Sequence, residues 1–420
     1  MNKYLPRIID KEIEELMKIM GAILIEGPKW CGKSTTGEQY AKGILRFQDP
    51  DRQKEYEEIK NVRPSLFLDG EKPLMFDEWQ RYPVVWDCVR SDVDKTGLKG
   101  QYILTGSAKP ADNAVMHTGT GRIARVVMRP MSLFESGESN GQVSLKDIID
   151  GKDIKGISNL ELEDICVAAV RGGWPEAVKI KGDLKYRIIK EYVNSLVTEE
   201  VKSVDGTERN PEKMRAVLRS LARNISTPVK DTTLVEDTKN LFEQEISRPT
   251  LLDYLNTLER LFVIENINAT NLNFRSKTAI RTKSKKEFID PSIATAVLGM
   301  SDKDLIRDLN LFGFIFECMA IRDLKVYSND YDGKISFYRN ENGFEIDAIL
   351  RLDNGKWGAI EIKLGEGRIE EGVNNLLEFK KLVDVEKEGE PAFLMVLTGT
   401  KYSYKRPDGV YVVSIGSLKD

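Results

Sequence analysis

The sequence has a single histidine, His117, and only four cysteines among its 420 residues. One histidine, which we expect in a surface loop, leaves no room for Ser-His-Asp hydrolysis or for a multi-histidine metal site. The cysteines form no C-x-x-C pair, which argues against a zinc site and against a disulfide framework. They are Cys31, Cys88, Cys166 and Cys318. Any chemistry must therefore rest on carboxylates, lysines, arginines and Mg²⁺.

The sequence also lacks long apolar runs. None approaches the length of a membrane span, and residues 1–6 lack the apolar core of a signal peptide. We therefore expect a cytoplasmic protein with no membrane partner. The formal net charge is −4, so any contact with nucleic acid must come from a local basic surface rather than from overall attraction. The chain is longer than one hydrophobic core usually supports, so we expect two or three domains.

What the sequence does contain is a complete phosphate-binding loop pattern, G-x-x-x-x-G-K-[ST], at residues 27–34. The apolar run 21–26 is typical of a buried parallel strand, and residues 35–42 predict a helix. We expect this loop to bind ATP or GTP, with its backbone N–H groups and the helix dipole facing the phosphates. Lys33 would reach the β- and γ-phosphates, and the Ser34 hydroxyl would bind Mg²⁺. The predicted nucleotide contacts are Gly27, Pro28, Lys29, Trp30, Cys31, Gly32, Lys33, Ser34 and Thr35.

Two further predicted strands end in polar residues. The strand 73–78 ends in Asp77 and Glu78, a pattern in which the aspartate holds Mg²⁺ and the glutamate acts as the base that polarises the attacking water. The strand 101–107 contains Thr105 and Ser107, either of which could sense the γ-phosphate at the carboxyl edge of the same sheet. A plain strand followed by a turn fits this second pattern equally well.

Arg122 follows the glycine-rich stretch 119–121. An arginine in this position could act as a finger on the nucleotide of a neighbouring subunit, which would imply a homo-oligomer. An ordinary surface arginine fits the pattern nearly as well.

These features together resemble the AAA-type ATPases of bacteria and archaea that carry a C-terminal domain of uncharacterised function. The resemblance rests on the motifs above and on the segments 121–123, 129–135 and 172–176, and it covers nearly the whole chain. It implies an AAA core that uses ATP and Mg²⁺, a winged-helix-like middle and a nuclease-like end. One departure is the loop sequence Lys29-Trp30-Cys31, which stands where the family usually shows Arg-Gln-Val, so no role for an arginine there is implied.

The middle of the chain predicts helices at 211–224, 232–242 and 247–261, followed by short strands over 262–269, the order of a winged helix. The first helix has one apolar face and a second face with Arg215, Arg219 and Arg223. The segment 275–286 is basic and has no acidic residue. Its cations are Arg275, Lys277, Arg281, Lys283, Lys285 and Lys286. Such side chains suit phosphate contacts with DNA, although a protein-interaction module or a merely solvated surface is the alternative.

The last third contains a second constellation. Strands at 344–350 and 357–364 would form a hairpin in which Glu361 and Lys363 share one face, and Asp347 can lie beside them. Two carboxylates for a divalent metal and a lysine beside the water form the set needed to hydrolyse a phosphodiester. The arrangement resembles the PD-(D/E)XK nucleases, and Glu317 matches an acid that some members place on their first helix. A sheet with one solvated face, or a binding module of this fold, is the alternative.

We therefore predict an α/β protein in three parts. An AAA-type P-loop core, with a parallel sheet covered by helices on both faces and a helical lid, would span 1–203. A winged-helix-like domain would span 204–286, and an α/β restriction-endonuclease-like domain 287–420. The expected function is an ATPase that acts on nucleic acid, with DNA as the expected partner, by ATP-dependent binding or Mg²⁺-dependent cleavage. The alternatives are an ATP-switched binding or regulatory protein with a catalytically silent C-terminal domain, and a protein-remodelling ATPase.

Overall fold

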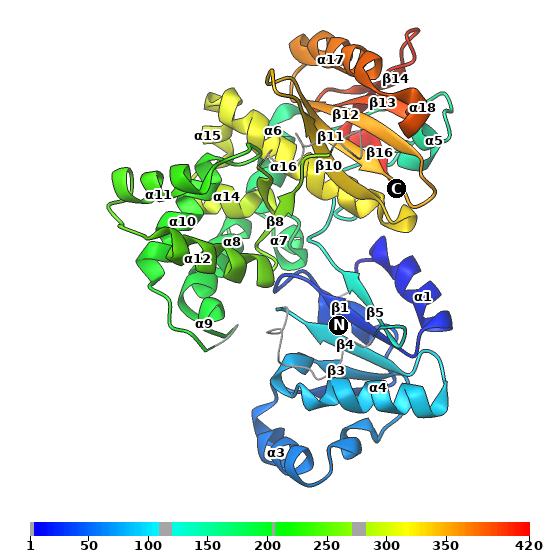
Figure 1. Ribbon diagram of the computed structural model, residues 1–420, viewed down its shortest axis with the longest axis vertical. Coiled ribbons are helices and arrows are strands. Elements are labelled where there is room, and N and C mark those ends of the chain that lie inside the picture. The colour runs from blue at the N-terminus through cyan, green and yellow to red at the C-terminus, as the bar shows by residue number, and fades with distance from the viewer. Residues whose placement is uncertain (1–3, 109–119, 204–205, 271–282) are drawn as a thin grey trace. The chain divides into compact units, whose positions relative to one another are not determined.

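The computed structural model describes residues 4–108, 120–203, 206–270 and 283–420 (Figure 1). His117 and three residues of the predicted basic segment, Arg275, Lys277 and Arg281, lie outside these ranges. The chain divides into two compact units. Unit 1 comprises Met1–Pro130, Glu199–Glu208 and Thr257–Val263, and unit 2 comprises Met131–Thr198, Arg209–Asn256 and Ile264–Asp420. No helix within the described ranges is long and apolar enough to span a membrane.

Unit 1 is built on a five-stranded sheet in which every strand is parallel to its neighbours. The strand order is β2 (Gly43–Arg46), β3 (Leu74–Asp77), β4 (Tyr102–Gly106), β1 (Ala22–Glu26) and β5 (Ile123–Val127). The apolar run predicted before the phosphate loop forms β1, which is buried along its whole length. This order and the all-parallel pairing confirm the predicted P-loop sheet.

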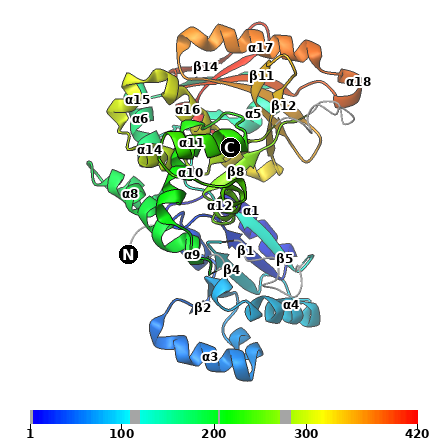
Figure 2. The same cartoon turned by 60° about the vertical axis from the view of Figure 1, so that its left-hand side comes forward.

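Helices cover both faces of this sheet, as buried parallel strands require (Figures 1 and 2). On one face, α1 (Ile9–Ile19) packs against Ile23 and Ile25 of β1, and α2 (Lys33–Glu38) packs against β3 and β4. On the other face, α3 (Gln53–Val62) and α4 (Val84–Thr96) pack against the alternate side chains of the same strands. The helix α2 ends at Glu38, four residues before the predicted end at residue 42.

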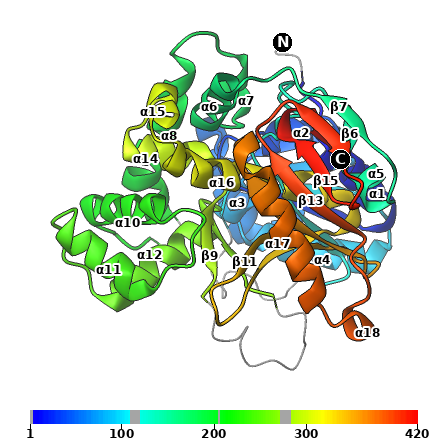
Figure 3. The same cartoon turned by 90° about the horizontal axis from the view of Figure 1, so that it is seen from above.

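The main sheet of unit 2 has seven strands of mixed direction. Its order is β10 (Lys334–Arg339), β11 (Glu345–Arg351), β12 (Trp357–Lys363), β13 (Phe393–Thr398), β15 (Tyr411–Ser414), β14 (Tyr402–Lys405) and β7 (Lys155–Ile157). The helix α17 (Ile369–Leu382) lies over one face of it (Figure 3), and α16 (Leu309–Tyr327) contacts β10 and β12. The strands predicted over 344–350 and 357–364 form as β11 and β12, and pair as an antiparallel hairpin.

The segment after the P-loop core differs from the prediction. We expected the helices before residue 203 to form a lid on the ATPase core. Instead, β7 completes the edge of the C-terminal sheet, and β6 (Val143–Ser144) pairs with β16 (Leu418–Lys419). The helices α6 (Leu162–Arg171), α7 (Pro175–Lys179) and α8 (Lys185–Ser195) also belong to unit 2. These strands find their partners more than 240 residues away in the sequence, which local composition cannot reveal.

The middle of the chain forms the predicted helices within about two residues of the predicted bounds. They are α10 (Pro211–Arg223), α11 (Asp231–Asn240) and α12 (Arg248–Arg260). Ser247 is the N-cap of α12, since its Oγ accepts a hydrogen bond from Thr250 N at 3.3 Å. An antiparallel hairpin follows, β8 (Ile264–Ile267) with β9 (Lys285–Phe288). The shorter helices α14 (Pro291–Leu298) and α15 (Asp302–Arg307) then lead to α16.

Candidate functional site

The phosphate-binding loop lies where β1 ends and α2 begins, at the carboxyl edge of the unit 1 sheet. Gly27 and Gly32 have φ angles of 152° and 104°, a region that glycine enters without steric cost. A Cβ at Gly27 would lie only 2.1 Å from the Met128 carbonyl oxygen, so no other residue fits there. The Lys33 side chain is buried, and its Nζ donates to the Pro28 carbonyl at 2.7 Å. The loop therefore has the tight backbone on which phosphate binding depends.

The predicted magnesium residues meet at the same edge. Strands β3 and β4 are neighbours, and their register sets Asp77 opposite Thr105. The Asp77 Oδ1 atom accepts hydrogen bonds from Ser34 Oγ and from Thr105 Oγ1, each at 2.6 Å. The end of the loop, the end of β3 and the end of β4 thus converge on one carboxylate.

Glu78 follows directly in the left-handed region, with φ 58°, which is uncommon for a residue other than glycine. Its Oε2 accepts from Ser107 Oγ at 2.9 Å and from the Gln80 side chain, and its N–H donates to Thr105 Oγ1 at 3.2 Å. Thr105 and Ser107, which could equally have been an ordinary strand end, therefore both contact the acidic pair. The structure brings together all the residues predicted around Asp77 and Glu78.

Arg122 lies elsewhere. It directly precedes β5, and the next residue, Ile123, pairs with Ala22 at the start of β1. Because the strands are parallel, this is the amino edge of the sheet, opposite to the phosphate loop. The Arg122 Nε atom lies 2.5 Å from Asp94 Oδ1 in a largely exposed ion pair. Arg122 therefore lies away from its own chain's phosphate loop, and its predicted role on the nucleotide of a neighbouring subunit stays a prediction.

Two contacts that hold the phosphate loop could not be predicted from the sequence. The buried Arg7 donates to the carbonyl oxygens of Cys31 at 2.9 Å and Arg129 at 2.7 Å, so it ties the loop to the segment after β5. The Lys29 Nζ atom lies 2.5 Å from Glu200 Oε1. Both partners of this pair belong to unit 1, although Glu200 lies some 170 residues further along the chain.

In unit 2, the hairpin β11–β12 groups three of the predicted residues. The paired register of the two strands begins at Ala348 and Ile360. Beyond it, Asp347 Oδ2 accepts from Ile362 N at 2.8 Å and from Lys363 Nζ at 3.2 Å. Lys363 also forms an ion pair with Glu361. Asp347, Glu361 and Lys363 therefore lie together, as the hairpin geometry predicts.

The face of β12 that carries Glu361 is covered, however. Helix α17 packs on it so closely that a Cβ at Gly372 would lie 3.3 Å from Glu361 Cβ. Glu361 is 1% exposed. Burial, reinforced by the nearby Asp347, raises the pKa of Glu361 to about 8.

The predicted third acid, Glu317, is buried on α16 and pairs with Lys285 Nζ at 2.7 Å. Lys285 Nζ also lies 2.6 Å from Glu345 Oε1. The prediction that Lys285 is a solvent-facing phosphate contact is therefore wrong, because alternation along β9 turns this side chain inward, where it is 2% exposed. In the part of the chain that the structure describes, no three His, Cys, Asp or Glu side chains are grouped so as to hold a metal ion. Asp347, Glu361 and Glu317 therefore form no such group of three, and their role in binding a metal ion stays a prediction.

Comparison with known proteins divides the chain into three parts. Residues 20–136 match the family described as AAA domain. Residues 162–304 match a Domain of unknown function (DUF8612), and residues 312–418 match another Domain of unknown function (DUF4143). No curated protein matches the chain.

Among solved structures, a Walker-type ATPase of Pyrococcus abyssi is 15% identical with a TM-score of 0.41, and the match covers 69% of this chain and 94% of that one. A signal transduction ATPase with numerous domains from Pyrococcus horikoshii is 12% identical with a TM-score of 0.26, over 77% of this chain and 48% of that one. Similarities this weak carry no functional argument. The match to the AAA domain does carry one, because an AAA domain implies an ATPase that binds ATP, usually with Mg²⁺. The chain therefore carries an AAA-type P-loop ATPase domain at its amino end, followed by two domains of unknown function.

Proposed function

We propose that this chain hydrolyses ATP at the carboxyl edge of the unit 1 sheet, with Mg²⁺ held by Ser34 and Asp77. The observation that carries the proposal is the pair of 2.6 Å hydrogen bonds that bring the Ser34 and Thr105 hydroxyls onto one Asp77 oxygen. Hydroxyl and carboxylate oxygens are the ligands that Mg²⁺ prefers beside substrate phosphates. The residues present therefore fit the ion.

Each side chain then has one role. Lys33 holds the β- and γ-phosphates, and Thr105 keeps Asp77 oriented from the next strand. Glu78 accepts the proton of the attacking water, and its hydrogen bonds with Ser107 and Gln80 fix the direction of its carboxylate. Bound at this edge, Mg²⁺ would neutralise the charge that develops on the transferred phosphoryl group.

The test is to replace Glu78 by glutamine, which keeps the size of the side chain and removes the base. Turnover of ATP should fall by about 10²- to 10⁴-fold, whereas ATP binding should persist, so that the variant traps bound ATP. Lys33→Ala should abolish binding or turnover and leave the protein folded. Glu58→Gln, an exposed acid on α3, is the matched control and should hydrolyse ATP normally. If Glu78→Gln hydrolyses ATP at the wild-type rate, Glu78 is not the base.

As a second candidate, we propose that nucleic acid is the partner of unit 2 and DNA the expected form. The support is the winged-helix order of α10, α11, α12 and the β8–β9 hairpin, together with exposed cations at Arg223 and Lys283. The Asp347–Lys363–Glu361 group adds the carboxylates and lysine of a nuclease-like site. Because Lys363 forms ion pairs with both Asp347 and Glu361, cleavage would require a divalent ion to displace it from Asp347.

Binding and cleavage of labelled DNA and RNA, with ATP and Mg²⁺ present, test this second candidate. Cleavage that is lost in Asp347→Asn, and kept in the exposed control Asp353→Asn, would support a nuclease. Binding without cleavage in the wild type would instead favour the ATP-switched binding protein with a silent C-terminal domain. If neither nucleic acid binds, the second candidate fails while the ATPase proposal stands.

A further inference from the structure

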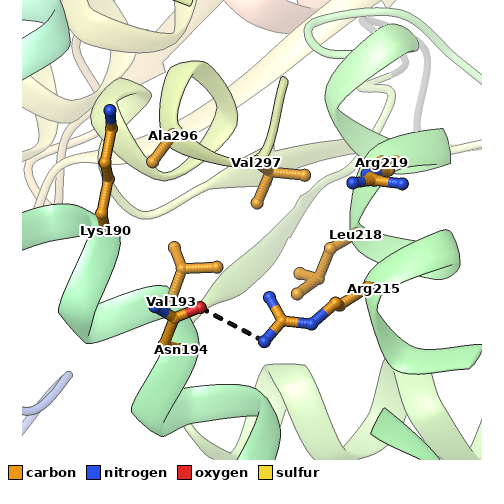
Figure 4. A pocket seen from close by; sticks show the side chains of 8 residues that line it. All are labelled: Lys190, Val193, Asn194, Arg215, Leu218, Arg219, Ala296 and Val297. Atoms are coloured by element: carbon orange, nitrogen blue, oxygen red, sulfur yellow. Dashed lines mark hydrogen bonds between the residues drawn. The ribbon is translucent and has the colours of Figure 1, made fainter. Parts of the chain in front are cut away.

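Unit 2 contains a pocket of about 240 Å³ between three helices, remote in sequence from both sites described above. Helices α8 and α10 form two of its sides, and the end of α14 forms a third (Figure 4). The residues that line it are Lys190, Val193, Asn194, Arg215, Leu218, Arg219, Ala296 and Val297. Both arginines, Arg215 and Arg219, belong to the basic face that the sequence predicted on α10.

The rim of this pocket carries three cations and, among the described residues that line it, no acid. Arg215 donates from its guanidinium to Asn194 Oδ1 at 3.2 Å, and its Nε atom is 3.9 Å from the exposed Glu212 carboxylate. The Arg219 guanidinium lies 5.9 Å from the Phe242 ring centroid. A neutral amide, one exposed acid at the limit of ion-pair distance from Arg215, and an aromatic ring leave most of the charge of the three cations uncompensated, so the pocket favours an anion.

The floor of the pocket, below these cations, is apolar. Val193 and Leu218 are buried, and Ala296 and Val297 are partly exposed beside them. An inorganic ion alone would leave these apolar side chains facing water, whereas a ligand with a short hydrocarbon part would cover them. Drug-sized ligands occupy pockets of roughly 300–1,000 Å³, so the occupant here is smaller and has only a few carbon atoms.

We propose that this pocket binds a small organic phosphate, whose phosphate contacts Lys190, Arg215 and Arg219 and whose carbon atoms lie on the apolar floor. A phosphate monoester fits three cations better than a carboxylate does, because it carries about −1.5 to −2 charges at neutral pH and offers three acceptor oxygens to the arginine forks. The site is independent of the phosphate loop and of the proposed ATPase mechanism.

The test is calorimetric titration of the full chain with n-butyl phosphate, in a Lys33→Ala background so that the phosphate loop does not contribute. We expect one site per chain. Arg219→Glu, at an exposed position, should weaken binding by about 10- to 100-fold, as expected for the loss of a charge-assisted hydrogen bond. Lys190→Gln should weaken it in the same direction. Inorganic phosphate should bind more weakly than n-butyl phosphate in the parent protein.

The matched control is Arg223→Glu, an exposed arginine one turn further along α10 that does not line the pocket. It changes the net charge equally and should leave binding unchanged. Equal losses in Arg219→Glu and Arg223→Glu would show general attraction and overturn the proposal, as would the absence of any binding to the parent. Binding of inorganic phosphate as tight as that of n-butyl phosphate would refute the role of the floor. If a DNA duplex displaces n-butyl phosphate and loses affinity in Arg219→Glu, the cations contact a nucleic-acid backbone instead, and the proposal fails.

Discussion

Replacing Lys285 by methionine should destabilise the C-terminal sheet strongly, although the sequence presents this lysine as one of a run of surface cations. Burial by itself would lower the pKa of Lys285, but the carboxylates of Glu317, Asp347 and Glu345 outweigh it, so the pKa is raised and the lysine stays charged. Methionine preserves most of the apolar stem and removes only the ammonium. The change therefore isolates the electrostatic contribution.

The expected magnitude follows from what the lysine leaves behind. Glu317 is 8% exposed and Lys285 Nζ is its ion-pair partner at 2.7 Å. Removing one member of a buried pair costs about 3–5 kcal/mol, because the other charge remains buried and uncompensated. Replacing both members with neutral side chains costs much less. The double variant Lys285→Met, Glu317→Gln should therefore be more stable than Lys285→Met alone, by roughly 1–3 kcal/mol.

The assay is unfolding in urea, followed by hydrogen exchange of peptides from β11 and β12, which reports on this sheet rather than on the ATPase core. Lys286→Met, on the same strand and partly exposed, is the control and should change stability by less than about 0.5 kcal/mol. The reasoning would be refuted if Lys285→Met behaved like this control. It would also be refuted if the Glu317 change added to the loss instead of relieving it.

Three further predictions concern single residues. Thr105→Val should lower ATP turnover about tenfold, by loss of one hydrogen bond to Asp77, and steady-state phosphate release measures it; unchanged turnover would remove Thr105 from the site. If Arg122 acts across subunits, mixing Arg122→Ala with Lys33→Ala protein should restore some turnover, whereas full activity in a strict monomer would exclude such a role. Burial raises the pKa of Glu287 to about 7, so the folded state binds this proton more tightly than the unfolded chain does. The contribution of Glu287 to the free energy of unfolding should therefore be fully present below about pH 4.5 and should be lost as the pH rises through 7. Glu287→Gln should flatten that dependence in unfolding measured from pH 5 to 8, and an unchanged slope would assign the dependence to another group.

Much of the nucleotide site could be predicted because its signals are local. The loop 27–34 can be recognised from its own glycines, lysine and serine. The strands β1 and β3 are short apolar runs, of which β1 ends directly before the loop and β3 ends at Asp77. Parallel strands bring their carboxyl ends to one edge, so the order of the motifs already implied that Ser34, Asp77 and Thr105 would meet. The helices α10 to α12 could also be predicted, since each has its own apolar periodicity.

Contiguous residues were thus enough to predict three features: a phosphate loop, two acids at a strand end, and a hairpin that joins Asp347 to Glu361 and Lys363. The places where separate segments meet became known only from the fold. It placed Arg122 at the amino edge because β5 runs parallel to β1, and it joined β6 and β7 to strands near the end of the chain. It also buried Lys285 beside acids from α16 and β11. A local pattern records the charge of a lysine, whereas its burial depends on packing between segments distant in the sequence.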